Sequence, residues 1–335
     1  MSALGVVSPG YPFSQGGVTD HTARLEHGWR HGGHTVRILS AVDVDPGTVA
    51  ATWADAGVTA ALIQYVPFLY ARRGLSAFPR RFALAAHQAG VRVTTFVHEP
   101  WVPPTRLPWL VLGPLQRLQL LRLVKVSDAV ATPVPAWSER FEGASVLYVG
   151  STLGEPEHPP LRSPELPSPV VFSPFAAGLR WPWIVDAVRA IGAGLIVIGA
   201  DRATALEHPI VAPLVADDWD FRGRLPARDV LSLLARARLV LAPFVDGLTG
   251  RRTSALAALS TGARLLTSDG HLVDPTLVAG PAILGTTREG YARAAVECWE
   301  IPQTPDERER QLAWYQALLN PRALDHMLLT LMLGS

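Results

Sequence analysis

The sequence predicts an α/β protein made of two doubly wound domains, each with a parallel sheet between helices. Short runs of Val, Ile, Leu and Ala alternate with segments whose apolar residues recur at helical spacing, a pattern typical of strands buried on both faces. This alternation occurs twice, on either side of residues 154–169, which contain six prolines. A chain of 335 residues is long enough for two such domains.

The first half of the chain predicts an N-terminal domain at residues 1–153. After the first strand, Val18, Thr22, Leu25 and Trp29 recur with the period of a helix, which ends near Gly32. The apolar runs that we interpret as strands lie at 4–7, 36–39, 58–63, 91–97, 129–132 and 146–149.

The second half predicts a C-terminal domain at residues 170–304, joined to the first by a linker at 154–169. The tail is helical from Pro305 and interrupted at Pro321, and we expect the helix at about 321–335 to pack back on the N-terminal domain. Strands are expected at 170–172, 195–198, 239–242 and 264–267, and helices at 183–191, 227–235, 254–261 and 288–299.

Composition excludes several classes of protein. With 48% hydrophobic and 18% charged residues, the chain is not of the disordered type, and a net charge of +1 gives no reason to expect a nucleic-acid partner. The single cysteine, Cys298, has no partner for an internal disulfide, and no Cys/His cluster has zinc-ligand spacing, so we expect no metal site. Residues 1–10 lack the features of a signal peptide, which predicts a cytoplasmic protein.

Ligands of open parallel sheets bind beyond the carboxyl ends of the strands, and three candidates of the first domain lie there. Gly16 and Gly17 directly precede the first helix, where glycine backbone and free N–H groups suit a phosphate, although a plain turn is the alternative. His98 and Glu99 follow the strand at 91–97 and form either a site or a simple strand cap. His21 is a candidate general base, but a solvated or structural histidine is the favoured interpretation.

Residues 243–254 are the richest candidate, because polar and glycine residues converge there on one helix N-terminus. Charge-assisted hydrogen bonds from arginines and loop amides are suited to a diphosphate, with a solvated arginine pair as the alternative. Arg180, which follows the first strand of the second domain, is expected to add a phosphate contact. The candidate donor-binding residues of the loop are Asp246, Gly247, Leu248, Thr249, Gly250, Arg251, Arg252 and Ser254.

Taken in order along the chain, these segments resemble the family-4 retaining glycosyltransferases. The glycine pair 16–17, its helix and the run Gly33-His34-Thr35-Val36 are similar to the N-terminal region of that family, which usually reads Gly-Gly, a helix, then Arg-Gly-His-x-Val. The likeness continues through His98-Glu99 and the Phe-Arg-Gly-Arg-Leu-Pro run at 221–226, and it ends at 258–267, so it spans most of the chain.

The resemblance implies a metal-independent enzyme of GT-B fold, with two Rossmann-like domains facing each other across a cleft. It implies that the second domain holds the donor nucleotide and that the glycine loop at 16–17 reaches over the diphosphate. His98 matches a histidine beside the donor sugar and acceptor, and Arg180 stands where the family often has a phosphate-binding lysine. Asp246 matches the first of two glutamates that face the donor sugar and the ribose.

Three departures from the family pattern concern the donor loop. The second glutamate is replaced by Ala257 or Ser254, depending on the end from which the residues are counted. The loop is about three residues longer, and the insertion coincides with 250–252; Pro174 replaces an arginine. We infer that Arg251 or Arg252 restores the lost phosphate charge.

The function expected from this pattern is transfer of a hexosyl unit from a nucleotide-diphosphate sugar to an acceptor hydroxyl, without a cofactor and with retention. The alternatives are an inverting GT-B enzyme with His21 as base, a non-catalytic GT-B nucleotide-binding protein, and a two-domain binding protein of the periplasmic type, against which the missing signal peptide argues.

The acceptor is expected to be a small molecule, a glycan or a lipid. The aromatic and basic segment 64–76 is a candidate acceptor loop. Peripheral membrane contact is a second hypothesis, because 107–125 is rich in leucine and carries Arg117, Arg122 and Lys125; an ordinary core-facing helix is the alternative.

Overall fold

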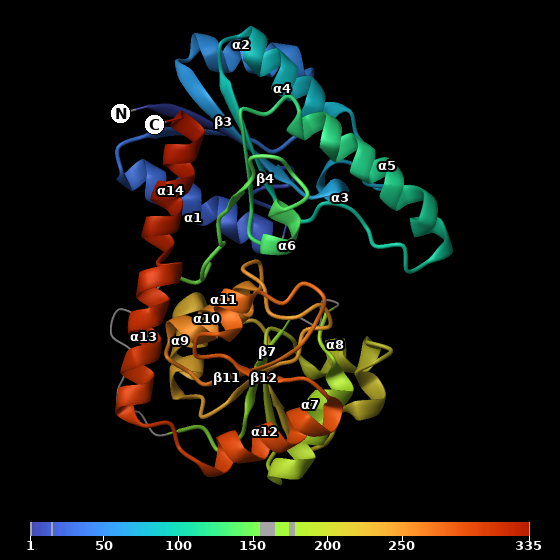
Figure 1. Cartoon of the computed structure of the whole chain (residues 1–335), viewed down its shortest axis with the longest axis vertical. Coiled ribbons are helices and arrows are strands. Elements are labelled where there is room, and N and C mark those ends of the chain that lie inside the picture. Colours follow the sequence, from blue (N-terminus) through green and yellow to red (C-terminus); the bar gives the residue numbers. More distant parts are fainter. Residues whose placement is uncertain (1, 15, 155–164, 174–177, 335) are drawn as a thin grey trace. The chain divides into compact units, whose positions relative to one another are not determined.

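A computed structural model describes residues 2–14, 16–154, 165–173 and 178–334. The chain divides into two compact units (Figure 1): unit 1 is Met1–Thr152 with Pro321–Ser335, and unit 2 is Leu153–Asn320. Most of the segment predicted as a linker, and Pro174 with it, lies outside the described residues.

Unit 1 is a six-stranded parallel sheet in the order β2-β1-β3-β4-β5-β6. Helices cover both faces of a parallel sheet, so the side chains on both faces are buried, which is why its strands are rich in Val and Leu. The strands are β1 (Ala3–Val7), β2 (Thr35–Leu39), β3 (Val58–Tyr65), β4 (Arg92–Val97), β5 (Ala129–Thr132) and β6 (Ser145–Val146). The helices are α1 (Gly17–His31), α2 (Pro46–Asp55), α3 (Pro67–Tyr70), α4 (Phe78–Gln88), α5 (Leu107–Val124), α6 (Pro135–Ser138) and α14 (Pro321–Leu333).

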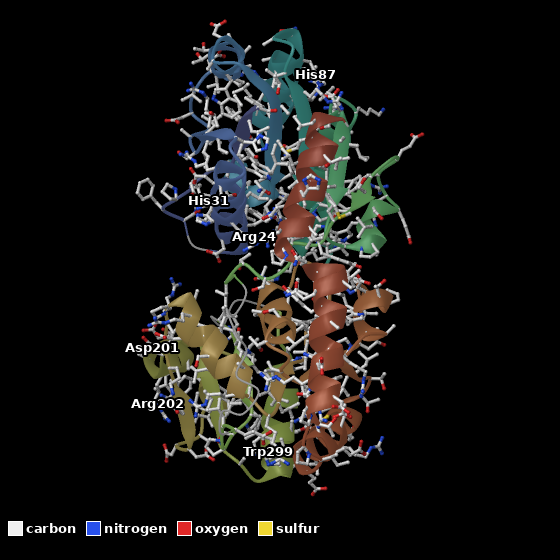
Figure 2. The ribbon with its side chains drawn as sticks, turned by 90° about the vertical axis from the view of Figure 1, so that its left-hand side faces the viewer. Arg24, His31, His87, Asp201, Arg202 and Trp299 are labelled. Atoms are coloured by element: carbon white, nitrogen blue, oxygen red, sulfur yellow. The ribbon has the colours of Figure 1, made fainter. Side chains whose placement is uncertain are left out.

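The C-terminal helix α14 completes the core of unit 1. Leu328 and Met332 are buried against Leu4 and Leu62 of the sheet. At its first turns Asp325 accepts a hydrogen bond from the guanidinium of Arg24 at 2.6 Å, and Figure 2 shows Arg24 beside this helix. Helix α14, which begins some 170 residues after Thr152, is thus part of unit 1.

Unit 2 has a second six-stranded parallel sheet, in the order β12-β11-β10-β7-β8-β9. Its strands are β7 (Val170–Phe172), β8 (Leu195–Ile198), β9 (Trp219–Phe221), β10 (Val240–Ala242), β11 (Leu265–Ser268) and β12 (Ile283–Gly285). The helices are α7 (Trp181–Ile191), α8 (Arg202–Glu207), α9 (Ala227–Arg236), α10 (Thr253–Ser260), α11 (Pro275–Val278), α12 (Arg288–Glu300) and α13 (Pro305–Leu319), with a 3-10 turn at Ala212–Leu214.

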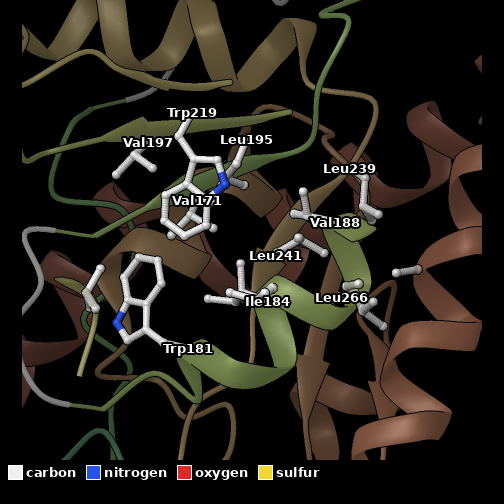
Figure 3. Packing of buried hydrophobic residues seen from close by; sticks show 14 of the residues in the cluster. Val171, Trp181, Ile184, Val188, Leu195, Val197, Trp219, Leu239, Leu241 and Leu266 are labelled. Atoms are coloured by element: carbon white, nitrogen blue, oxygen red, sulfur yellow. The ribbon is translucent and has the colours of Figure 1, made fainter. Parts of the chain in front are cut away.

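The core of unit 2 lies between this sheet and helices α7 and α12. Ile184 and Val188 of α7 pack on Val171, Val197 and Leu241, and all five are nearly or fully buried (Figure 3). The indoles of Trp181 and Trp219 stack at 6.3 Å between ring centroids at one end of the cluster.

The predicted α/β class with two doubly wound domains is confirmed. Two strands were missing from the prediction, β9 and β12, and β6 is shorter than the predicted strand at 146–149. All three are edge strands of two or three residues, and they are only partly buried. An edge strand needs no continuous apolar run, so the hydrophobic pattern that identifies the central strands is weak there.

Each sheet has one point at which the strand order reverses. In unit 1 the chain passes from β1 outward to β2 and returns to the other side of β1 at β3; in unit 2 the same reversal separates β7 from β10. The loops after the two strands diverge at such a point and leave a crevice, which is where doubly wound sheets bind ligands. These two reversal points define where a site is expected in each unit.

Candidate functional site

The reversal point of unit 2 is formed by residues 178–180 after β7 and 243–252 after β10. The two loops are tied together by backbone hydrogen bonds, from Val245 N–H to the Gly178 carbonyl at 2.7 Å and from Arg180 N–H to the Pro243 carbonyl at 2.8 Å. Most of the donor-binding residues predicted from the sequence therefore lie in two adjoining loops at one edge of the sheet.

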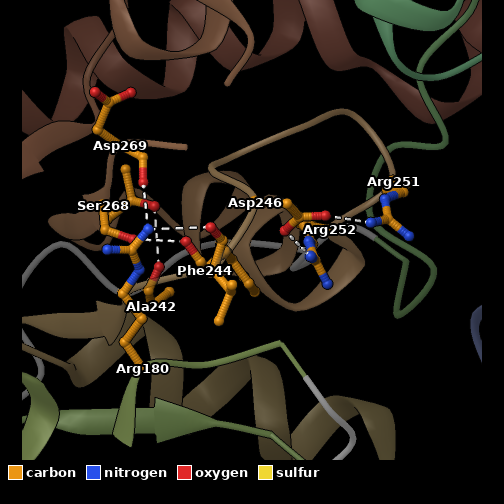
Figure 4. A network of polar contacts seen from close by, with 10 residues as sticks. Arg180, Ala242, Phe244, Asp246, Arg251, Arg252, Ser268 and Asp269 are labelled. Carbon is orange, nitrogen blue, oxygen red and sulfur yellow. Dashed lines mark hydrogen bonds and ion pairs between the residues drawn. The ribbon is translucent and has the colours of Figure 1, made fainter. Parts of the chain in front are cut away.

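Asp246, Arg251 and Arg252 form one ion-pair cluster in this loop (Figure 4). Each arginine donates a hydrogen bond to a different oxygen of the Asp246 carboxylate. The three side chains are only 13%, 18% and 17% exposed. Arg252 also lies 4.6 Å over the ring of Phe244 and stands against Gly178, so it spans both loops.

The cluster holds one more positive than negative charge. Burial opposes ionisation of the Asp246 carboxyl, but the charges of Arg252 and Arg251 outweigh it and keep its pKa below the usual value. Two guanidinium groups then face one carboxylate. The family resemblance implies that Asp246 faces the donor sugar, and the arginines are expected to bind phosphate, whereas the structure pairs all three side chains with one another.

Arg180 is held mainly by backbone carbonyl groups. Its Nη2 donates to the carbonyl oxygens of Val245 at 3.0 Å and of Asp269 at 3.2 Å, and its guanidinium lies 4.5 Å over the ring of Trp183. The buried Nε atom has no hydrogen-bond partner among the described residues. Arg180 therefore connects the loops after β7, β10 and β11 and adds positive charge at the same edge (Figure 4).

The other predicted donor residues shape the loop. Gly247 has φ 93°, which favours glycine, and a Cβ there would come within 2.9 Å of the Val273 backbone. Leu248 and Thr249 are fully buried, and the Thr249 hydroxyl has no partner among the described residues. The loop continues through buried Gly250, and Ser254 is the second residue of α10, the helix in which Ala257 is fully buried.

In unit 1, Gly16 and Gly17 form the open start of α1. Gly16 caps the helix with φ 145°, and no atom lies within 4 Å of the position that a Cβ would occupy. Both glycines are exposed. The first backbone N–H groups of an α-helix have no partner within it, so this terminus can accept an anion.

Behind this terminus lies a buried group of His21, Gln64 and His98, which we call the histidine cluster. His98 Nε2 and Gln64 Oε1 are 2.6 Å apart, so Nε2 carries the proton, because an amide oxygen only accepts. The rings of His21 and His98 are 5.3 Å apart between centroids, edge to face. The three residues come from α1, from β3 and from the end of β4, next to the reversal point of the sheet.

Burial makes His21 a neutral imidazole at neutral pH. It is 1% exposed, and desolvation lowers its pKa well below 6.5, assisted by the charge of Arg24. The prediction of a solvated His21 is wrong, while a structural role fits its burial. Asp20 is exposed, so the two neighbours do not form an acid–base pair, since successive helical residues face different directions.

Gln64 belongs to a strand and not to the acceptor loop that the sequence predicts at 64–76, since Gln64 and Tyr65 are fully buried in β3. An amide near the end of the mainly apolar run 58–65 is the signal that indicates a polar group beneath a site. Glu99 is exposed, and its N–H lies 3.5 Å from the carbonyl oxygen of Tyr65.

No group of three His, Cys, Asp or Glu side chains in the described part of the chain is placed to hold a metal ion. No helix built from those residues is long and apolar enough to cross a membrane.

No protein-family model matches the chain, and no curated protein sequence matches it either. Solved structures do. An α-glucosyltransferase in complex with UDP and a 13-mer DNA containing an HMU base is 9% identical, with a TM-score of 0.65 over 100% of both chains. AviGT4, a glycosyltransferase involved in avilamycin A biosynthesis, is 15% identical, with a TM-score of 0.59 over 100% of this chain and 99% of its own.

A UDP-GlcNAc 2-epimerase from Methanocaldococcus jannaschii is also similar, at 10% identity and a TM-score of 0.55 over 99% of both chains. Two of these neighbours are glycosyltransferases and the third is an epimerase. The similarity shows that the chain has the GT-B fold, with two Rossmann-like domains.

Proposed function

We propose that the protein is a glycosyltransferase that moves a hexosyl unit from a nucleotide-diphosphate sugar to an acceptor hydroxyl. The observation that carries the proposal is the excess positive charge at the reversal point of unit 2, where Arg251 and Arg252 share one carboxylate and Arg180, bound to backbone carbonyl groups, adds a further positive charge. GT-B neighbours support it, because they include glycosyltransferases and one was solved with UDP. Fold alone does not assign a reaction, so the proposal depends on the charged loop.

In the proposed reaction, Arg251 and Arg252 of the ion-pair cluster bind the diphosphate of the donor. Negative charge grows on the diphosphate as the bond to the anomeric carbon breaks, and preorganised cations at that position lower the barrier. Arg251 and Arg252 exchange part of their bonding to Asp246 for phosphate oxygens, which leaves Asp246 able to accept hydrogen bonds from the donor. The N-terminus of α10 adds backbone N–H donors.

On the acceptor side, we assign His98 to the donor sugar and the acceptor. The hydrogen bond to Gln64 fixes its tautomer and ring orientation, and His21 supports the ring from behind. The open start of α1 at Gly16 and Gly17 is assigned to the diphosphate. The acceptor class proposed is a glycan or a lipid, with Glu99 as an exposed carboxylate next to His98.

We propose retention of configuration without a metal, as the family resemblance implies. The inverting alternative needs His21 as general base, but burial lowers the pKa of its imidazole well below 6.5, which makes it a weak base at neutral pH. NMR of the anomeric proton in the product distinguishes retention from inversion. A product with inverted configuration, together with loss of transfer in His21→Gln, would establish the alternative.

The proposal is tested by Arg251→Ala and Arg252→Ala. Each removes a charge-assisted phosphate contact, so we expect the donor KM to rise about tenfold or more, in line with roughly 1.5–3 kcal/mol for such a bond. Arg228→Ala is the matched control, since its side chain is 93% exposed on α9. An unchanged donor KM in both cluster variants would overturn the assignment.

The donor base is identified by a thermal-shift screen with UDP, GDP, ADP, CMP and dTDP and their sugars. A ligand at one hundred times its Kd stabilises the native state by roughly 2.7 kcal/mol. The second candidate, a non-catalytic nucleotide-binding protein, is favoured by the missing second glutamate, where α10 has Ala257 or Ser254. Binding in this screen without transfer or hydrolysis of any donor would establish it.

A further inference from the structure

Helix α5 of unit 1 is apolar on its outward face as well as on much of its inward face. Its inward face is formed by Gly113, Gln116, Leu120 and Leu123, which are buried. Its outward face is apolar, although surface helices normally place charged and polar residues there. The exposed apolar residues are Leu107 (82%), Leu110 (51%), Val111 (67%), Leu115 (46%) and Leu118 (46%).

The exposed apolar surface extends beyond the helix. Gln119 of α5 accepts a hydrogen bond from the Ser76 N–H at 2.6 Å, which holds the loop after α3 against the helix. A shallow cavity of about 410 Å³ there is lined by Leu75 and Leu118 together with Arg80 and Arg122. Apolar and cationic side chains thus adjoin at this part of unit 1.

At the other end of α5, two tryptophans stand among arginines. A cavity of about 420 Å³ is lined by Trp101, Trp109, Arg117 and Leu118. Arg117 lies 5.5 Å over the ring of Trp101, and Arg106 lies 4.8 Å over that of Trp109. Tryptophan and arginine side chains, with an apolar body and a polar end, are the residues enriched at membrane–water interfaces.

The charge of this part of the chain is strongly asymmetric. Of the chain's 30 basic and 29 acidic residues, nine basic and one acidic fall between residues 56 and 127, which leaves 21 and 28 for the rest. The one acid is Glu99, and two carboxylates reach the segment from outside: Asp45 lies 3.6 Å from Arg81, and Asp128 lies 2.7 Å from His87. In a nearly neutral protein, the segment that contains the exposed apolar helix is therefore strongly basic.

We propose that the outward face of α5, with the basic residues beside it, docks on an anionic lipid bilayer. The apolar side chains enter the acyl boundary, and Arg80, Arg117, Arg122 and Lys125 bind lipid phosphates. Basic residues near an anionic surface and buried apolar side chains both contribute to such binding. The proposal does not depend on the reaction that the protein catalyses.

Charge complementarity selects the bilayer over a second copy of this chain. Two copies joined through this surface would place two sets of basic residues opposite each other, with almost no acidic residues to pair them. An anionic bilayer supplies the opposite charge and an apolar phase at the same place.

The test is sedimentation of the full chain with vesicles of phosphatidylcholine alone or with 30% phosphatidylglycerol. We expect binding to the anionic vesicles, little to the neutral ones, and release by 0.5 M NaCl, since salt screens charges. Leu107→Ser with Val111→Ser, and separately Arg117→Gln with Arg122→Gln, should each lower the partition coefficient about tenfold or more.

Matched controls come from exposed residues of unit 2. Leu206→Ser with Ile210→Ser removes two apolar side chains that are 55% and 59% exposed, and it should leave vesicle binding unchanged. Circular dichroism verifies folding of each variant. The proposal is overturned if the chain does not sediment with anionic vesicles, if α5 variants bind as wild type does, or if they only dissociate a dimer in light scattering.

Discussion

His21 illustrates at the scale of one residue how burial decides chemistry. The sequence indicates an imidazole at the start of a helix, next to an aspartate, where a solvated group or a base is expected. Packing against Phe96 and His98 removes it from water and depresses its pKa. His98 is also buried, but its Nε2 forms a hydrogen bond with the side chain of Gln64.

The depressed pKa predicts a pH dependence of stability. Above pH 6.5 His21 is neutral in both the native and the unfolded state, so it has no effect. Below pH 6.5 the unfolded chain gains a proton that the native state refuses, and the free energy of unfolding falls by about 1.4 kcal/mol per pH unit until the folded pKa is reached. Urea unfolding at pH 7.0 and 5.0 measures this loss.

His21→Gln should flatten this dependence, because glutamine does not titrate. His31→Gln is the control: His31 is exposed on the same helix (Figure 2), and its replacement should leave the slope as in the wild type. Equal slopes in the wild type and His21→Gln would contradict a buried, neutral His21.

At the scale of elements, the site of unit 2 depends on close contact between two loops. The loop after β11 passes the loop after β10 backbone to backbone, with hydrogen bonds from Leu272 N–H to the Asp246 carbonyl at 2.9 Å and from Asp274 N–H to the Leu248 carbonyl at 2.8 Å. Glycine at 270 permits the approach. A Cβ there would lie 2.2 Å from the carbonyl carbon of Asp246.

Gly270→Ala is therefore expected to displace the loop that carries the ion-pair cluster. The new methyl group would meet the Asp246 backbone, which cannot move aside as a flexible side chain can. We therefore expect the free energy of unfolding to fall by about 1–3 kcal/mol and nucleotide binding to weaken. Gly28→Ala in α1 is the control, because its Cβ would meet Asp325 at an ordinary 3.5 Å and alanine favours a helix. Unimpaired nucleotide binding in Gly270→Ala would refute the role of this contact.

For the whole molecule, the chain termini belong to one unit, since α14 returns to unit 1. Leu328 is 2% exposed in the core that also contains Leu4 and Val6. Leu328→Ala should lower the free energy of unfolding of unit 1 by about 2–4 kcal/mol, because it leaves a cavity.

Hydrogen exchange locates this loss. Amide protection should fall in β1 and β3 and stay unchanged in β10 and β11, if the two units unfold separately. Met327→Ala, a neighbour that is 52% exposed, is the control and should change little. Equal loss of protection in both sheets would mean that the two units unfold as one.

The sequence by itself determined the doubly wound α/β class, most central strands and the loops that follow them. Continuous apolar runs such as 58–63 are strong local signals, and glycine and arginine between a strand and a helix are the pattern from which a phosphate-binding loop is predicted. It also determined the basic, leucine-rich character of 107–125. These features depend on residues that are close together in the sequence, so a sequence pattern is enough to predict them.

Only the tertiary structure decided which side chains meet. That Asp246 pairs with Arg251 and Arg252, that Gln64 holds His98, and that the apolar side of α5 faces outward all depend on segments brought together by the sheet. Ion pairing and burial are set by through-space distance and by exclusion of water, and neither is fixed by spacing along the chain.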